Sequence, residues 1–194
     1  LRVPGHVDGN ELAVRAVLGQ QVSVAGARTA AARLTERFGR PLAQPSDGLS
    51  HLFPDVATLA ALAPEDLPMP RSRGRALIAL CAALADDALA LDRGPDRDDV
   101  RQRLLEIPGI GPWTADYIAL RALGHPDVFL PTDLGTRHAL AALAHDPAGA
   151  AELSERWRPW RSYAQMHLWQ SLTALTPAAP TDPAAPTDPT SKET

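Results

Sequence analysis

The sequence predicts an all-α protein with one globular domain. Apolar residues recur at helical spacing over most of residues 1–176, and no stretch shows the apolar–polar alternation that is typical of a strand. Glycine, proline and capping residues separate the periodic segments. The chain has 194 residues, which is enough for one domain with a substantial hydrophobic core.

Two helices are expected at the start of the domain, over residues 10–20 and 23–38. Asn10 and Ser23 have side chains that cap helix N-termini. Gly39 ends the second helix, because glycine is common just after a helix C-terminus.

The rest of the domain is expected to be a series of shorter helices joined by loops. Residues 41–54 contain prolines and aspartates and are predicted to be a loop, and residues 125–131 (HPDVFLP) a short extended stretch. The other helices are expected over residues 56–62, 64–67, 71–91, 97–106, 112–123, from 132 or 133 to about 144, 146–157 and 160–175.

Residues 177–194 differ from the rest of the chain. They consist mainly of Pro, Ala, Thr and Asp and contain no large apolar residue, so they cannot bury enough surface to offset the entropy lost on ordering. We therefore expect a globular domain over residues 1–176 and a disordered tail. No apolar run is long enough to span a membrane, no signal peptide is recognisable, and the chain begins with Leu, which suggests a domain of a longer protein.

Cysteine and charge narrow the classes of protein. Cys81 is the one cysteine and lies in an apolar run, so we expect a buried thiol, no internal disulfide, no all-cysteine zinc or iron–sulfur site and a reducing cytoplasm. The net charge of −4 argues weakly against nucleic-acid binding, although residues 1–176 hold 20 acidic residues and 18 arginines, a net charge of −2. The one lysine, Lys192, lies in the tail.

Residues 107–111 (IPGIG) interrupt a helical region. Pro108 cannot continue the preceding helix, whereas Gly109 and Gly111 tolerate positive φ and a close approach of another backbone. Pro112 suits the first turn of the next helix, whose free amides and dipole would then form an anion site suited to phosphate. From these residues alone, an ordinary turn between packed helices explains the segment equally well.

A wider set of motifs resembles one protein family. Residues 105–115 (LEIPGIGPWTA) resemble the helix–hairpin–helix signature, and residues 127–133 (DVFLPTD) resemble the aspartate-bearing segment of the helix–hairpin–helix DNA glycosylase superfamily, in its 3-methyladenine DNA glycosylase II branch. Residues 13–28, 69–80 and 156–169 resemble the same branch. The resemblance covers about residues 8–172 and implies a two-lobed all-α fold with a cleft between the lobes.

The resemblance implies a monofunctional DNA glycosylase. Such an enzyme flips N-alkylated purines of the 3-methyladenine and 7-methylguanine type out of duplex DNA and excises them, leaving an abasic site for base-excision repair. Deaminated bases remain an open extension of this range. The implied enzyme is monomeric and cytoplasmic, close to the nucleoid. It requires no cofactor and has no metal site, although a monovalent cation could bind the backbone of the hairpin.

Asp133 matches the catalytic aspartate of the family. Its position also suits a helix N-cap, where the ionised carboxylate is favoured. A fixed carboxylate would stabilise the positive charge that develops on the sugar, or orient the attacking water. One carboxylate suffices because an alkylated purine is already cationic and leaves easily. Asp127 is the competing carboxylate, and we expect it to pack or cap the loop.

The family resemblance also places the base pocket. Trp113, Tyr117 and Trp169 match its lining, and their electron-rich ring faces suit a cationic base. Of the other aromatic residues in these motifs, we expect Trp157 in the core, and Trp160 and Tyr163 are open between core and pocket.

Contacts to DNA are expected from three places. The hairpin would contribute Pro108, Gly109, Ile110, Gly111 and Thr114. Gln21 matches the wedge that fills the gap left by the flipped base, where the best-known member of the branch has a leucine. Arg73, which lies between Arg71 and Arg75 near a helix start, would contact phosphate, although a solvated basic turn is the simpler reading of these arginines.

Two alternatives remain. A bifunctional glycosylase/lyase would need a lysine for a Schiff base, at the position held here by Trp113, and residues 1–176 contain none. A non-catalytic module that binds alkylated DNA within an alkylation-response regulator is the second alternative, against which Asp133 and the aromatic set argue. The branch usually carries an N-terminal α/β domain that can add a wall to the pocket, and this chain starts just before the helical part.

Overall fold

The computed structural model describes residues 1–91, 94 and 96–175, without the side chains of residues 173–175. The predicted disordered tail lies outside the described residues. The described part is mainly helical, as predicted, and includes one two-stranded sheet. The elements are α1 (Gly9–Leu18), α2 (Val24–Phe38), β1 (Arg40–Ser46), β2 (Leu49–Leu52), α3 (Val56–Ala60), the 3-10 turn η1 (Pro64–Asp66), α4 (Arg71–Ala85), α5 (Arg97–Glu106), α6 (Pro112–Arg121), α7 (Leu134–Ala142), the 3-10 turn η2 (Pro147–Gly149), α8 (Ala150–Glu155) and α9 (Arg161–Leu175).

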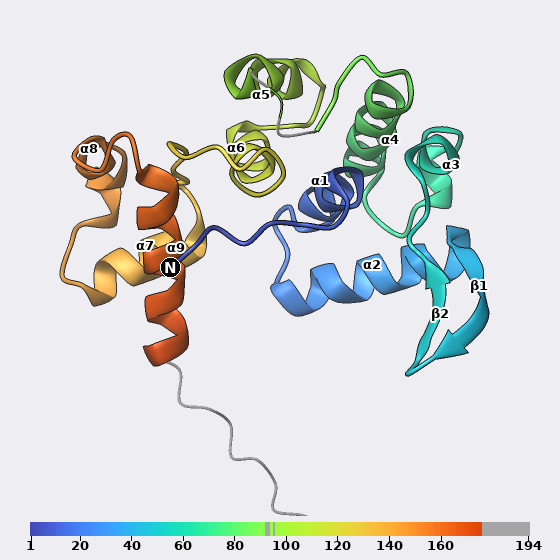
Figure 1. The fold of residues 1–194 in the computed structure, drawn as a ribbon, viewed down its shortest axis with the longest axis horizontal. Coiled ribbons are helices and arrows are strands. Elements are labelled where there is room, and N and C mark those ends of the chain that lie inside the picture. Colours follow the sequence, from blue (N-terminus) through green and yellow to red (C-terminus); the bar gives the residue numbers. More distant parts are fainter. Residues whose placement is uncertain (92–93, 95, 176–194) are drawn as a thin grey trace, which may run out of the picture.

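The helices form two groups. In Figure 1, α2, α3 and α4 lie on one side of the molecule, α7, α8 and α9 lie on the other, and α1 and α6 lie between them. The larger buried cluster includes apolar side chains of α1, α2, α4 and α6. A smaller cluster centres on Phe129, Leu140 and Leu168 and joins α7, α8 and α9. The predicted division into two lobes corresponds to these two clusters.

The caps of the first helices agree in part with the sequence. Ser23 caps α2 as predicted, and its hydroxyl accepts from the amide of Gly26 at 3.1 Å. Asn10 was the wrong cap for α1, because Asp8 holds that position and its carboxylate accepts from the amides of Asn10 (2.8 Å) and Glu11 (3.1 Å). An aspartate is at least as good a cap as asparagine, and its charge also suits the helix dipole.

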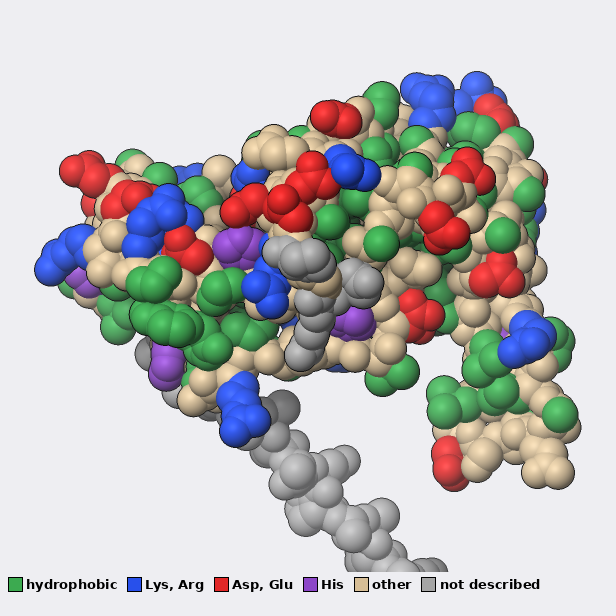
Figure 2. Space-filling model, turned by 45° about the horizontal axis from the view of Figure 1, so that its top comes forward, with side chains coloured by type: hydrophobic (Ala, Val, Ile, Leu, Met, Phe, Trp, Pro, Cys, Tyr) green, Lys and Arg blue, Asp and Glu red, His purple; other side chains and the backbone are tan. Residues whose placement is uncertain are grey.

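Residues 41–54 were predicted as a loop, which is wrong for residues 41–46 and 49–52, because residues 40–52 fold into two paired strands. They form the antiparallel β1–β2 hairpin, whose turn residues Asp47 (φ 50°) and Gly48 (φ 79°) both have positive φ. An Asp-Gly pair with this geometry is a favoured two-residue hairpin turn, and it was the signal in the sequence. Pro41 and Pro45 favoured the loop prediction, because proline is excluded from central strands. An exposed pair of edge strands nevertheless tolerates proline. The hairpin projects from the body and carries exposed hydrophobic side chains (Figure 2).

Gly39 ends α2 for a reason other than the expected one. Its φ of −72° is available to any residue, so no left-handed conformation is needed. A Cβ atom at this position would instead lie 2.3 Å from the carbonyl oxygen of Leu52 and 2.4 Å from that of Thr35. Only glycine therefore allows the hairpin to pack this closely against the end of the helix.

Cys81 is fully buried in the core, as expected, and burial raises the pKa of its thiol to about 12.

Residues 1–8 run from α1 across to the C-terminal end of α6 (Figure 1), where the carbonyl of Pro4 accepts from Arg121 Nε at 3.3 Å. His6 Nε2 donates to the carbonyl of Ala122 at 2.8 Å. None of the described helices has the length and apolar character needed to cross a membrane.

Candidate active site

The hairpin between α5 and α6 exposes backbone rather than side chains. Gly109 has φ 91°, and it is solvent-exposed together with Pro108 and Gly111. The amides of Gly109 and Gly111 donate to no described residue, whereas the amide of Ile110 donates to Ile107 O at 3.0 Å. Free amides beside the N-terminus of a helix with Pro112 in its first turn are suited to an anion.

Two of the predicted hairpin contacts cannot be made by side chains. Ile110 is 4% exposed and belongs to the larger core, and Thr114 is 2% exposed. Thr114 instead accepts from Gln20 Nε2 at 2.9 Å, and the same nitrogen donates to the carbonyl of Gly109 at 3.1 Å. Gln20 therefore ties the α1–α2 turn to the hairpin, a role that sequence reasoning missed.

The predicted wedge, Gln21, lies on this α1–α2 turn. It is exposed and has φ 55°, a left-handed conformation that is uncommon for a residue other than glycine. The strained turn is held by the neighbouring Gln20 contacts to the hairpin. Val22 follows directly, is 42% exposed and lines the cavity described below, so an apolar side chain also stands beside the predicted wedge.

Asp133 caps α7 and accepts four hydrogen bonds. Its Oδ1 accepts from the amide and the hydroxyl of Thr136 at 2.9 and 3.1 Å and from Trp169 Nε1 at 2.8 Å. Its Oδ2 accepts from Trp113 Nε1 at 3.1 Å. All of these partners are donors, which complements an ionised carboxylate because that group can only accept. Oδ2 carries a single partner and so keeps a lone pair for a further contact.

One face of α9 holds the loop that leads to Asp133. Ser162, Gln165 and Trp169 are spaced three and four residues apart, so they lie on one side of the helix. Ser162 accepts from the amide of Val128 at 2.9 Å, Gln165 accepts from that of Leu130 at 3.0 Å, and Trp169 donates to Asp133. The backbone of the loop is thereby attached to the helix at successive points.

Gln165 also orients the hydroxyl that serves Asp133. Its side chain is fully buried, and Nε2 donates to Thr136 Oγ1 at 2.5 Å. Because this contact occupies a lone pair of the hydroxyl, the hydroxyl proton is directed to Asp133 Oδ1. Gln165 thus positions Thr136, and Thr136 positions the carboxylate of Asp133. The sequence analysis did not predict these roles, because the two residues are 29 positions apart in the chain.

A cavity of about 790 Å³ opens beside Asp133. It lies between α1 and α2 on one side and α6, α7 and α9 on the other. Trp113 and Tyr117 stack with ring centroids 5.3 Å apart, and the ring of Trp169 lies 6.2 Å from that of Tyr117. The structure therefore brings the three predicted pocket residues and the predicted catalytic aspartate to one cavity.

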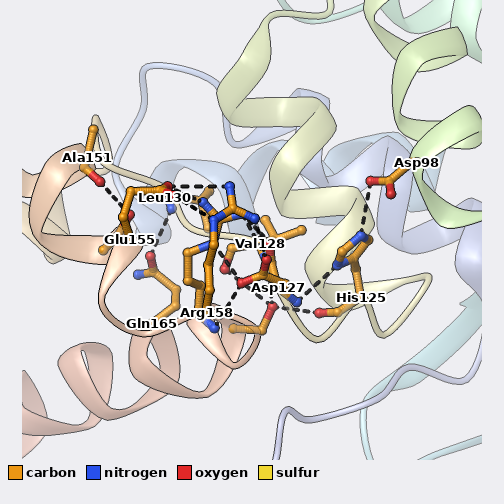
Figure 3. A network of polar contacts seen from close by, with 12 residues as sticks. Asp98, His125, Asp127, Val128, Leu130, Ala151, Glu155, Arg158 and Gln165 are labelled. Atoms are coloured by element: carbon orange, nitrogen blue, oxygen red, sulfur yellow. Dashed lines mark hydrogen bonds and ion pairs between the residues drawn. The ribbon is translucent and has the colours of Figure 1, made fainter.

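Asp127, the competing carboxylate, is held by arginine side chains and makes no contact with Asp133 (Figure 3). It accepts from Arg161 Nε at 2.7 Å and from Arg158 Nη1 at 2.7 Å, and Glu155 links to both arginines. Burial alone would raise the pKa of Asp127, but the hydrogen bonds and charge of Arg161, aided by the charge of Arg158, hold it below its ordinary value. Asp127 thus packs and pairs in the loop, as expected, and does not line the cavity beside Asp133.

We expect Asp127→Asn to destabilise the fold by about 2 kcal/mol at neutral pH, because the side chain of Arg161 is only 17% exposed and would keep Glu155, an exposed carboxylate, as its remaining charged partner. A lowered pKa in the folded state means that Asp127 contributes its full stability above its ordinary pKa of 3.8 and loses it as the pH falls below that value. Urea unfolding at pH 7 and near pH 3 should therefore show a gap between wild type and variant that narrows in acid. An unchanged gap would contradict this assignment. The matched control is Glu152→Gln, an exposed carboxylate on α8 that forms no ion pair with a described residue.

The remaining sequence candidates lie elsewhere. Trp157 packs edge-on against Phe129 with centroids 5.5 Å apart, as expected for a core residue. Trp160 and Tyr163 form an exposed pair that lines neither the core clusters nor the cavity. Arg73 is half-buried and lines a groove that also includes Val22.

Comparison with known proteins agrees with this geometry. A family model described as HhH-GPD superfamily base excision DNA repair protein matches residues 14–161. The match covers most of the chain, so the chain is a member of the HhH-GPD superfamily of base excision DNA repair proteins.

Individual members of this superfamily are similar to most of the chain. The chain is 49% identical over 174 residues to the probable bifunctional transcriptional activator/DNA repair enzyme AlkA of Mycobacterium tuberculosis, covering 88% of this chain and 35% of that protein. It is 41% identical over 172 residues to DNA-3-methyladenine glycosylase 2 of Escherichia coli, covering 87% and 60%. The 3-methyladenine DNA glycosylase Mag1 of Schizosaccharomyces pombe, solved in complex with abasic DNA, matches with a TM-score of 0.67 and 20% identity over 89% of this chain and 84% of that one. The chain thus spans about a third to three fifths of the two curated relatives.

Proposed function

We propose that this domain is a monofunctional DNA glycosylase that excises N-alkylated purines, of the 3-methyladenine and 7-methylguanine type, from duplex DNA. The observation that carries the proposal is the carboxylate of Asp133, fixed by four donors at the edge of a cavity lined by Trp113, Tyr117 and Trp169. Relatives described as 3-methyladenine DNA glycosylases support the substrate class.

The arrangement suits the charge changes of the reaction. An alkylated purine carries positive charge that stacks favourably on electron-rich rings. As the N-glycosyl bond breaks, that charge moves to the sugar, where a fixed carboxylate stabilises it without having to reorganise. Asp133 Oδ2, with its remaining lone pair, is the oxygen placed for this contact or for orienting the attacking water.

Duplex DNA is the proposed partner and the exposed amides at Gly109 and Gly111 the proposed phosphate contact. This mode of binding needs no cationic side chain, so it is compatible with a net negative charge. Gln21 and Arg73 are proposed as additional contacts to the duplex. The proposal includes a monomeric cytoplasmic enzyme that needs no cofactor.

The test is release of free base from methylated duplex DNA. We expect the wild-type protein to liberate 3-methyladenine and 7-methylguanine and to leave abasic sites without cutting the strand. Borohydride should trap no covalent adduct with abasic DNA, because a Schiff base needs an amine and residues 1–176 contain no lysine. Base release measured by chromatography and strand integrity measured on a denaturing gel report the two outcomes separately.

The competing hypothesis is a DNA-binding module without catalysis. It predicts retention of methylated duplex DNA in a binding assay with no release of base above the buffer control. Trapping of an adduct would instead favour a glycosylase/lyase. The four donors around Asp133 favour catalysis, since a module that merely binds a damaged base has no need of an oriented carboxylate.

A further inference from the structure

Arg121 is a cation in the candidate pocket that the mechanism leaves without a role. It is the last residue of α6, one turn beyond Tyr117, and it lines the same cavity as Asp133. Its guanidinium carbon lies 5.8 Å from the centroid of the Tyr117 ring, and Nη1 donates to the Tyr117 hydroxyl at 3.4 Å. Arg121 is thus attached to a ring that is proposed to face the extruded base.

The contacts of Arg121 leave most of its donors free. Besides Tyr117, it donates from Nε to the carbonyl of Pro4 at 3.3 Å, and it forms no ion pair with any carboxylate among the described residues. A guanidinium has five N–H groups in a rigid fork, so three remain for a ligand. The other arginines of the cavity differ, because Arg15 pairs with Glu11 at 2.6 Å and Arg28 is exposed.

A half-buried guanidinium with free N–H donors is suited to bind a ligand oxygen that accepts hydrogen bonds. An extruded purine nucleotide offers two kinds, the carbonyl at C6 of the base and the phosphates on either side of the sugar. The phosphates of the bound strand are assigned to the exposed hairpin amides. Arg121 lies instead on the helix that carries the two stacked rings, beside the hydroxyl of the second ring.

We propose that Arg121 is a specificity-determining residue that donates hydrogen bonds to the C6 carbonyl of the extruded purine. This proposal rests on the glycosylase function proposed above. Bases with a C6 carbonyl, such as 7-methylguanine and hypoxanthine, gain a charge-assisted contact. 3-Methyladenine presents an amino group at C6, which donates and therefore opposes the guanidinium. The carbonyl of Pro4 and the ring of Tyr117 hold the guanidinium in place, so that it can discriminate a C6 carbonyl from a C6 amino group.

The experiment compares two bases released from the same methylated duplex DNA. In the Arg121→Met variant, which keeps an apolar stem against Tyr117 but no donors, we expect the rate of 7-methylguanine release relative to 3-methyladenine release to fall about tenfold. Release of hypoxanthine from a defined duplex should fall by a similar factor. Arg121→Lys, which keeps the charge without the planar fork, should give an intermediate ratio.

The ratio separates this role from a structural one. If Arg121 supports the fold or holds a phosphate, release of both bases falls equally and the ratio is unchanged, which overturns the proposal. The matched control is Arg103→Met, which removes an exposed arginine paired with Asp99 on α5 and should leave the ratio at the wild-type value. Failure of the proposed function looks different, because the wild-type protein then releases neither base.

Discussion

We expect Asp133→Asn to lower the rate of 3-methyladenine release by about a thousandfold, with little change in affinity for DNA. The substitution removes the negative charge that would oppose the positive charge on the sugar in the transition state. It leaves the hairpin amides untouched, and these carry the proposed contact to phosphate. Single-turnover base release and equilibrium binding to duplex DNA would measure the two effects.

Asparagine also disturbs the pocket in a way that the structure specifies. If its oxygen keeps the Oδ1 contacts to Thr136 and Trp169, its amide nitrogen takes the place of Oδ2 and faces Trp113 Nε1, a donor, at about 3.1 Å. Two donors would then oppose each other, and Trp113 would have to move. Loss of charge and displacement of one pocket ring should both lower the rate.

The variant should still fold, because asparagine is a good N-cap for α7. Asp146 provides the control, since its Oδ1 caps η2 by accepting from the amide of Ala148 at 2.9 Å and it does not line the cavity. Asp146→Asn should retain full base release. Equal release by wild type and Asp133→Asn would remove Asp133 from the mechanism.

The sequence was most informative where structure is determined locally. The hairpin at 107–111, Pro112 in the first turn of α6 and Asp133 at the start of α7 all follow from conformational preferences within a few residues. The β1–β2 hairpin was missed because two prolines outweighed its Asp-Gly turn, although an exposed strand pair tolerates proline. Conformational preferences of neighbouring residues therefore predicted the mainly helical fold class, but they did not predict the β1–β2 hairpin.

The side chains that hold the hairpin and the Asp133 loop in place could not be predicted from the spacing of residues along the sequence. Gln20 contacts a hairpin that lies 89 positions further along the chain, and Gln165 reaches Leu130 from 35 positions away. Polar residues of these types are ordinary on helices, and their partners become visible once the helices are packed. The cavity itself joins α1 and α2 to α6, α7 and α9, so Arg121 and Val22 could not be placed beside Asp133 from the sequence.

The second large effect is expected at the hairpin, where two glycines that look equivalent in the sequence differ in the structure. Gly109 has φ 91°, and a Cβ atom there would lie 2.6 Å from Ala76 Cβ on α4. Because Ala76 Cβ is fixed to the backbone of a buried helix, either the hairpin or α4 must shift. We expect Gly109→Ala to destabilise the fold by about 3 kcal/mol and to weaken binding to duplex DNA at least about tenfold.

Gly111→Ala is the matched comparison. Gly111 has φ −90°, which any residue adopts, and a Cβ atom there would meet nothing within 4 Å. Its substitution should leave stability and affinity close to the wild-type values. Thermal unfolding and fluorescence anisotropy with a labelled duplex would measure both variants. Equal losses in the two would show that DNA binding depends on flexibility of the hairpin in general, whereas a loss confined to Gly109→Ala ties it to the one conformation that turns the free amides outward.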